Sequence, residues 1–232
     1  MKGVTVAESL FTILTIVAVA MILFYANDKF GFLKLPGGGQ DGGGGGSGGN
    51  NNHITPGDSS QVSCVMEYAK ANATSGRKCD CGVDCEEYAS WIIQYSSQYG
   101  IPDPILVVAL MMQESSCNQY GNVGYGTYCN GVKKSSAGAV GLMQVMPSTG
   151  KGSCGYEIAD MCEPQKNIEC GIRVLRGKYD QCVREGHGTW DAALSAYNTG
   201  RCTSSVGMNF ASQVNDRSAK LTTVAANQCS IA

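Results

Sequence analysis

Hydrophobic residues recur every three or four positions through much of the chain after residue 58, which is the spacing of amphipathic helices. The pattern predicts helices over residues 62–72, 86–100, 104–115, 164–183, 189–198 and 210–228. Gly100 suits the end of the second helix. Asp103 and Pro104 suit the N-cap and first position of the third, and Thr189 suits the N-cap of the fifth. Alternating patterns are rare, with room for one short hairpin around 121–134, so we expect a mainly α domain.

The N-terminal segment has a different pattern. Residues 9–25 form a run of 17 residues without a charge, and with residues 4–7 they reach the roughly 20 residues that span a bilayer. We therefore expect residues 1–30 to be a membrane anchor. A cleaved signal peptide is one alternative. Lys2, Gly3 and Glu8 also resemble a type IV prepilin leader, which would link the protein to a secretion- or pilus-type assembly.

Residues 31–57 are expected to be a flexible linker between that segment and a single globular domain over residues 58–232. Glycine dominates the stretch from Pro36 to Gly57, and a chain this rich in glycine cannot bury apolar surface. The sequence therefore predicts a helical head on a flexible tether.

Cysteine is the strongest compositional signal. All twelve cysteines lie between Cys64 and Cys229, which predicts disulfides and a domain outside the cytoplasm, either periplasmic or at the cell surface. Metal binding by Cys79, Cys81 and Cys85 is the alternative, but zinc sites usually use paired spacings, so we expect no metal. The formal charge of −2 offers no basic field, so we expect no nucleic-acid partner.

Glu114 is the first candidate for chemistry. It ends a strongly apolar run and shares a helical face with Val107, Leu110 and Met111. Burial and the negative end of the helix dipole both disfavour the carboxylate and raise its pKa. A carboxyl group that stays protonated near neutral pH can act as a general acid. The structural alternative is a glutamate that accepts hydrogen bonds from Ser115 or Ser116.

Two further motifs follow. Residues 135–149 contain Gly138, Ala139 and Gly141 before Gln144, whose amide suits a sugar hydroxyl or acetamido group. Residues 193–200 place Tyr197 and Asn198 at the end of an apolar helix. Taken singly, the first motif is better explained by an ordinary tight turn with a surface glutamine, and Tyr197 by a core aromatic residue.

Together and in this order, the motifs resemble the catalytic domain of the soluble-lytic-transglycosylase type, within the lysozyme-like α+β superfamily. The resemblance rests on Glu114-Ser115, GAVGLMQ at 138–144, NIECG at 167–171 and AYNTG at 196–200, and it covers about residues 88–202. It implies a lysozyme-like fold and cleavage of peptidoglycan glycan strands without a cofactor.

The resemblance also implies residue roles. Glu114 would be the single acid and base that cleaves the bond between N-acetylmuramic acid and N-acetylglucosamine and leaves 1,6-anhydro ends. Ser115 and Tyr197 would hold or polarise Glu114, whereas Met143, Gln144 and Asn198 would line the sugar cleft. Two alternatives remain: a goose-type lysozyme-like hydrolase, and a pilin-like surface subunit that binds glycan without cleaving it. The sequence is compatible with remodelling of the cell's own wall and with attack on another cell.

The chain departs from the family pattern between Glu114 and Gly141, which lie 27 positions apart, about a dozen more than expected. The extra segment carries Cys129, and we expect a disulfide between Cys129 and Cys117.

Overall fold

The computed structural model of the protein describes residues 59–120, 131–132 and 134–229. The expected membrane segment, the linker and most of the expected hairpin lie outside these residues. Within the described ranges, β-pairing is limited to isolated bridges such as that between Tyr120 and Val132, so the expectation of a mainly α domain is confirmed. Among the helices in these ranges, none combines the length and apolarity needed to cross a bilayer.

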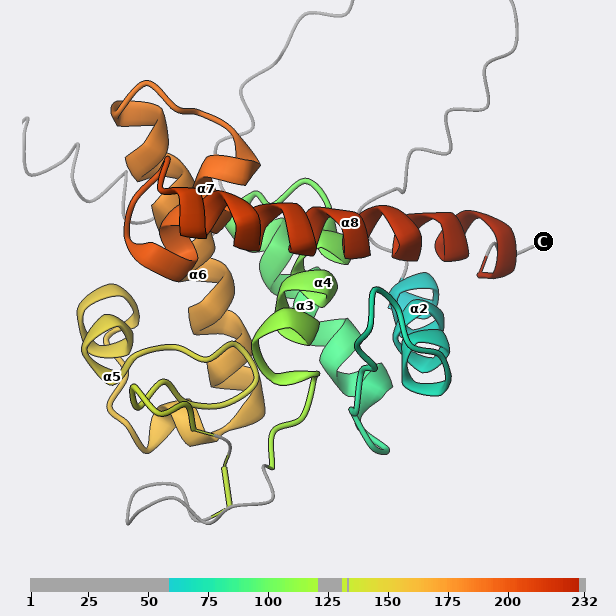
Figure 1. Cartoon of the computed structure of the whole chain (residues 1–232). Helices are drawn as coiled ribbons and strands as arrows, with labels where there is room; N and C mark the ends of the chain where they lie inside the picture. Colours follow the sequence, from blue (N-terminus) through green and yellow to red (C-terminus); the bar gives the residue numbers. More distant parts are fainter. Residues whose placement is uncertain (1–58, 121–130, 133, 230–232) are drawn as a thin grey trace, which may run out of the picture. The chain divides into compact units, whose positions relative to one another are not determined.

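The helices are labelled in Figure 1. They are α2 (Ser59–Ala71), α3 (Cys85–Tyr99), α4 (Pro104–Ser115), the short α5 (Pro147–Thr149), α6 (Pro164–Arg184), α7 (Trp190–Thr199) and α8 (Ser205–Gln228). A π turn at Gly150–Cys154 and a 3-10 turn at Asp160–Cys162 separate α5 from α6. Five of the six predicted helices agree with these bounds to within one turn.

The last helix begins earlier than the predicted residue 210. Ser204 caps α8 by accepting a hydrogen bond from the backbone N–H of Gly207 at 3.0 Å. Gly207 has no side chain to signal a helix, yet it is buried, and a Cβ added there would lie 2.2 Å from Ser195 Oγ. The close approach of α8 to α7 therefore requires a residue that weakens the sequence pattern.

Helix α4 is the centre of the domain. Every residue from Pro104 to Met112 is buried, because the helix packs against α8, α3 and α2 (Figure 1). Asp103 begins it by accepting a hydrogen bond from Ile105 N at 2.9 Å, as predicted. A helix that is apolar on all sides is stable only when its neighbours cover it. The end of α4 is therefore held firmly relative to the surrounding helices.

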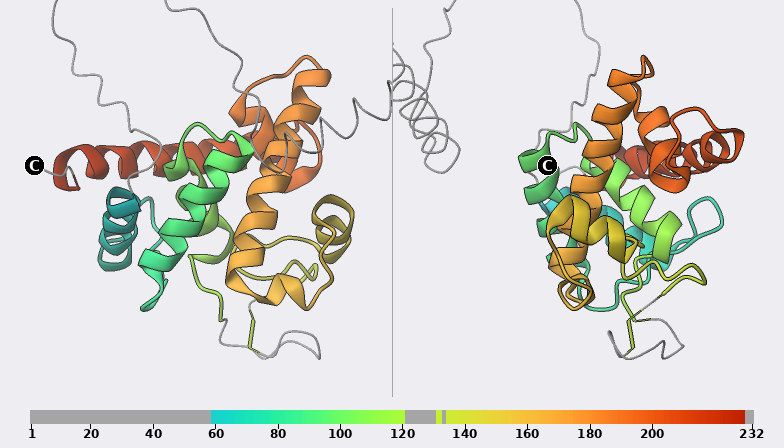
Figure 2. Two further views of the ribbon diagram at one scale, coloured as in Figure 1. Left: turned by 180° about the vertical axis from the view of Figure 1, so that it is seen from behind. Right: turned by 90° about the vertical axis from the view of Figure 1, so that its left-hand side faces the viewer.

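Helix α6 forms the second support of the site. It packs against α3 on one side and α7 on the other, and its first half lies beside the π and 3-10 turns (Figure 2). Helix α7 then packs against α8, which runs across the domain and returns the chain to α4 and α2 (Figure 2).

Disulfides cross-link these elements, as the cysteine pattern predicted. The described pairs are Cys64–Cys229, Cys79–Cys117, Cys81–Cys85, Cys154–Cys170 and Cys182–Cys202. Cys162 is disulfide-bonded as well. The three cysteines considered as metal ligands are therefore all in disulfides. No cluster of three or more His, Cys, Asp or Glu side chains suited to a metal occurs among the residues that the structure describes.

The expected pairing of Cys117 with Cys129 is wrong, because Cys117 is bonded to Cys79. Ser116 and Cys117 both have positive φ, at 60° and 55°, so the chain turns sharply after α4. This turn brings Ser116 O to the backbone N–H of Asp80, which donates a hydrogen bond to it at 2.6 Å. Cys117 thus faces the loop before α3.

Candidate active site

Glu114 is the next-to-last residue of α4, where the predicted helix places it. The helix ends at Ser116, whose backbone N–H donates to the carbonyl groups of Met111 and Met112 in a left-handed cap. The buried body of α4 and this cap fix the position of the Glu114 backbone. The Glu114 side chain leaves the helix at the edge of the core.

Burial raises the pKa of Glu114 to about 7, and the positive charge of Arg77 opposes this rise. Within the described part of the chain, no hydrogen bond is made to the Glu114 carboxyl group, and Ser115 instead donates to Met111 O at 3.1 Å. The described contacts therefore do not support the alternative of a structural glutamate that accepts hydrogen bonds from Ser115 or Ser116. A carboxyl group with this pKa can both give and take a proton near neutral pH.

Tyr197, on α7, is the aromatic residue of the candidate site that interacts electrostatically with this acid. Burial is the main cause that raises the Tyr197 pKa well above its usual value, and the charge of Glu114 adds to it. The Tyr197 hydroxyl donates to Met143 O at 2.7 Å. Tyr197 therefore connects the acid, through its electrostatic coupling, to the loop that carries Met143 and Gln144.

That loop is a tight turn in which Val140 and Val145 exchange backbone hydrogen bonds of 3.0 and 3.1 Å. Gly141 has a φ of 77°, and Gln144 has a φ of 45°, which is unusual for a residue other than glycine. Such a conformation costs roughly 1–3 kcal/mol, so the surroundings must impose it. Gln144 Nε2 donates to Gly141 O at 2.7 Å, which holds the side chain close to its own turn.

Asn167 and Gly171, on α6, hold the turn from behind. Asn167 is fully buried, accepts a hydrogen bond from Met143 N at 2.8 Å and donates to Val140 O at 2.9 Å. A Cβ at Gly141 would lie 2.5 Å from Asn167 Nδ2, and a Cβ at Gly171 would lie 2.4 Å from Met143 Cβ. Both residues stand in the NIECG motif, but their role as supports depends on contacts that the motif alone does not reveal.

A pocket of about 230 Å³ opens at this point. Three of the predicted site residues, Gln144, Tyr197 and Asn198, line it together with Met146 and Lys178. The other three lie behind the pocket or beside it. Met143 and Ser115 are fully buried, and Glu114 is coupled to the lining through Tyr197. The pocket thus offers amide and hydroxyl groups near an acid whose pKa burial raises to about 7.

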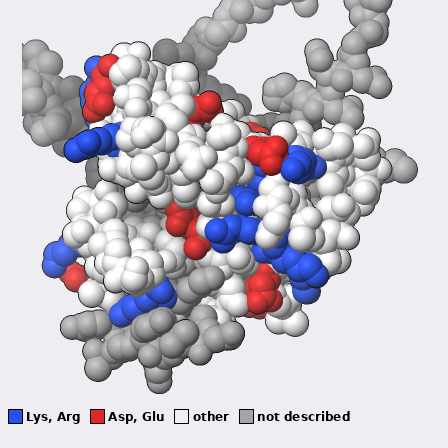
Figure 3. Space-filling view, in the orientation of Figure 1, with Lys and Arg blue, Asp and Glu red and all other residues white. Residues whose placement is uncertain are grey.

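Arg77, in the loop between α2 and α3, is a residue that no motif indicated. Its backbone pairs with that of Thr74 through hydrogen bonds of 2.7 and 3.2 Å. The buried Arg217 of α8 donates to Thr74 O at 3.4 Å and to Gln113 Oε1 at 3.0 Å, so it joins this loop to the residue before Glu114. Figure 3 shows acidic side chains near the middle of this face beside a cluster of Lys and Arg side chains.

Comparisons with known proteins agree with this geometry. The sequence model of the family described as "Transglycosylase SLT domain" matches residues 90–218, more than half of the chain. Membrane-bound lytic murein transglycosylase C of Mannheimia succiniciproducens is 32% identical over 129 residues, covering 51% of this chain and 32% of that protein. The protein of the same name from Glaesserella parasuis is 33% identical with the same coverage. The chain thus spans about a third of the length of the curated relatives it matches. The match includes Glu114, Gln144 and Tyr197, and the chain belongs to the transglycosylase SLT domain family.

Proposed function

We propose that this protein is a peptidoglycan lytic transglycosylase in which Glu114 is the single general acid and base. The observation that carries the proposal is one half-buried carboxyl group. Burial raises its pKa to about 7, and its charge acts on Tyr197 in the wall of a polar pocket. The names of the matched relatives support the same substrate, murein, which is peptidoglycan.

In the proposed reaction, Glu114 donates its proton to the glycosidic oxygen between N-acetylmuramic acid and N-acetylglucosamine as the bond from that oxygen to C1 breaks. The C6 hydroxyl oxygen of the same muramic acid then bonds to C1, and its proton passes to the Glu114 carboxylate. Glu114 is restored, no water is consumed, and the strand ends in a 1,6-anhydro ring.

The surrounding residues bind and orient the sugar in this proposal. Gln144 and Asn198 meet sugar hydroxyl or acetamido groups in the pocket that they line. Tyr197 fixes the Gln144 turn through its hydrogen bond to Met143 O, and it interacts electrostatically with the acid. Ser115 contributes through the end of α4, since its hydroxyl group bonds to Met111 O.

The absence of a second acid acting on Glu114, among the described residues, favours ring closure. A glycosidase with two carboxylates places them roughly 5 Å apart when it retains the configuration and 6.5–9.5 Å apart when it inverts it. Among the described residues, Arg77 is the charged group that shifts the Glu114 pKa, and no carboxylate adds to that shift. Asp191 is exposed and accepts from Asn215 at 2.8 Å, whereas Asp103 caps α4. An intramolecular nucleophile removes the need for a second carboxylate.

We further propose that the domain works outside the cytoplasm and is attached to a membrane. The five described disulfide pairs suit an oxidising compartment. The matched relatives are named as membrane-bound proteins. The apolar run within residues 1–30 supplies the candidate anchor in this chain.

Release of soluble fragments from purified peptidoglycan tests whether the protein is an enzyme. The wild-type protein should solubilise the wall, and Glu114→Gln, which keeps the size of the side chain, should not. Sedimentation with insoluble peptidoglycan shows whether the variant still binds. Equal release by the two proteins would exclude Glu114 as the acid, and binding without any release by wild type would favour a glycan-binding subunit.

A further inference from the structure

A second groove adjoins the candidate active site, between α6 and the turns that follow α5. Its volume is about 580 Å³. Thr149, Val174 and Lys178 line both this groove and the pocket that holds Gln144 and Tyr197. A ligand in the pocket can therefore extend into the groove without leaving the surface.

Cations dominate the α6 wall of this groove, which carries Arg173, Arg176, Lys178 and Arg184 against the single acid Asp180. Arg176 donates to Asp180 Oδ1 at 3.0 Å, so these two charges neutralise each other. Among the described residues, the other three cations have no acidic partner within salt-bridge distance. A chain with a formal net charge of −2 thus concentrates unpaired positive charge beside its candidate site.

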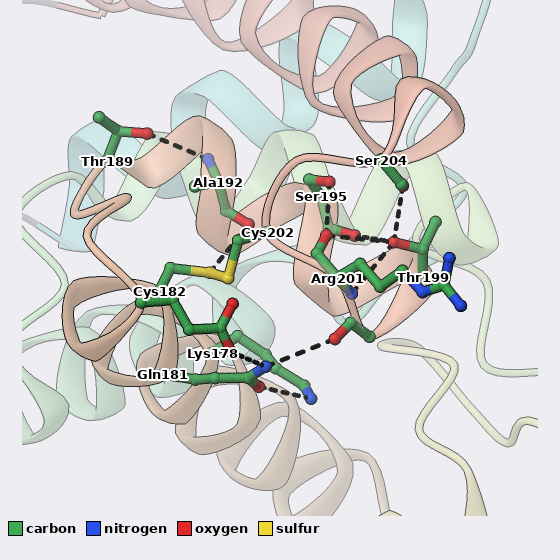
Figure 4. Close-up of a disulfide and its surroundings, with 12 residues drawn as sticks. Lys178, Gln181, Cys182, Thr189, Ala192, Ser195, Thr199, Arg201, Cys202 and Ser204 are labelled. Atoms are coloured by element: carbon green, nitrogen blue, oxygen red, sulfur yellow. Dashed lines mark hydrogen bonds between the residues drawn. A yellow bond between two sulfur atoms is a disulfide. The ribbon is translucent and has the colours of Figure 1, made fainter.

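The position of Lys178 is set by its neighbours. Its Nζ donates to Gln181 Oε1 at 3.2 Å, and Gln181 Nε2 donates to Gly200 O at 3.5 Å. Figure 4 shows Lys178 and Gln181 beside the Cys182–Cys202 disulfide, which fastens the end of α6 to the segment after α7. Lys178 is half-buried at the junction between pocket and groove, so its charge acts on a ligand that occupies either one.

The opposite wall suits the same kind of ligand. Ser148, Thr149 and Ser153 supply hydroxyl groups, and Gly152 leaves open space. The acid one turn before Arg173, Glu169, accepts hydrogen bonds from Tyr99 at 2.9 Å and Tyr156 at 2.7 Å. Its carboxylate is therefore engaged by two hydroxyl groups, one of which belongs to Tyr99 of the groove lining. Arginine guanidinium groups, which can donate two parallel hydrogen bonds, and hydroxyl donors together form a typical binding environment for carboxylate groups.

We propose that this groove binds the carboxylate groups of the stem peptides that peptidoglycan carries on its muramic acid residues, while the glycan strand lies in the adjoining pocket. This inference rests on the proposed function, because the peptide must belong to the same polymer as the strand. It extends that function by making the peptide part of what the enzyme recognises.

Binding of a free stem tetrapeptide to the full-length protein, followed by calorimetry, tests the groove separately from catalysis. The parent protein is Glu114→Gln, and the groove variant adds Arg173→Gln and Arg184→Gln. The charge-matched control adds Lys70→Gln and Lys220→Gln, two lysines on α2 and α8 that are paired with Glu67 and Asp216. The groove variant should bind at least about tenfold more weakly, whereas the control should bind like the parent.

The same peptide with its carboxylates amidated distinguishes charge recognition from contact with the peptide backbone. It should bind weakly to all three proteins. Equal affinity of groove variant and control, equal affinity for the amidated peptide, or no binding at millimolar peptide would each overturn the proposal. Cleavage by the wild-type protein of glycan strands stripped of peptides tests the proposed function independently, so the two failures are distinguishable.

Discussion

Cys79 and Cys117 are joined by a disulfide, which attaches the loop between α2 and α3 to the chain three residues after Glu114. The backbone N–H of Asp80 donates to Ser116 O at 2.6 Å, and Asn118 donates to Asp80 Oδ2 at 2.8 Å beside the same disulfide. The loop lies outside residues 90–218, which the family model matches. A segment that the family match does not include therefore delivers Arg77 to the candidate acid.

Replacing Arg77 with glutamine should change the pH dependence of activity. The guanidinium of Arg77 stabilises the Glu114 carboxylate and lowers its pKa, so its loss should raise that pKa. A general acid works only while protonated, so the alkaline limb of kcat/KM should move to higher pH, by up to about one unit. The profile is measured on glycan strands at low ionic strength, because salt screens an exposed charge.

Lys78→Gln is the matched control, since Lys78 is the exposed neighbour of Arg77 and carries the same charge. Its profile should overlay that of the wild type. Identical shifts in both variants would mean that net charge, and not the position of Arg77, governs the acid.

The burial of Glu114 should also make the free energy of unfolding depend on pH. A carboxyl group whose pKa rises from 4.5 to about 7 on folding binds its proton more tightly in the folded state. The free energy of unfolding should therefore fall as pH rises from about 4.5 to about 7. Glu114→Gln has no charge to bury, so it should exceed the wild type in stability at pH 8 by on the order of 3 kcal/mol.

Chemical denaturation at about pH 4 and pH 8 measures this difference. The gap between variant and wild type should nearly close at the lower pH, because both side chains are then neutral. Glu86→Gln, an exposed acid on α3, serves as the control. A gap of the same size at both pH values would contradict the burial of an ionisable Glu114.

The contact between Gly171 and Met143 supports the Gln144 turn, and a single methyl group should disturb it. Gly171→Ala would place a Cβ 2.4 Å from Met143 Cβ, so we expect a loss of about 1–3 kcal/mol in stability and a lower kcat/KM. Gly177→Ala lies in the same helix with no atom within 4 Å of the added Cβ. This control should be neutral or more stable by up to about 1 kcal/mol. Equal free energies of unfolding for the two variants would contradict the proposed support of the turn by the contact between Gly171 and Met143.

The disulfides should contribute unequally. Cys64–Cys229 closes a loop with a sequence separation of 165, whereas Cys81–Cys85 spans a separation of only 4. If cross-links act mainly on the unfolded chain, replacing the first pair with serine should cost about 5 kcal/mol and replacing the second about 2 kcal/mol. Thermal unfolding of the two double variants checks the order, and a larger loss from the local pair would contradict it.

Much of the helical frame could be predicted, because α6 has clear helical periodicity and α4 has the start signals Asp103 and Pro104. The start of α8 could not, since Gly207 is chosen for close packing and weakens the helical pattern. Disulfide pairing depends on which loops meet in space, so the partner of Cys117 was predicted incorrectly. The order of the motifs was enough to predict Gln144, Tyr197 and Asn198 as residues of one site. Arg77 has no motif, and its place beside Glu114 depends on tertiary contacts.

The chemical form of the new glycan end tests the central claim most directly. Peptidoglycan is digested by the wild-type protein in water enriched in heavy oxygen, and the released muropeptides are weighed by mass spectrometry. The account predicts 1,6-anhydro ends that are lighter than reducing ends by one water molecule and contain no heavy oxygen. Reducing ends that carry heavy oxygen at C1 would contradict it, because they would show that water, and not the C6 hydroxyl group, attacks C1.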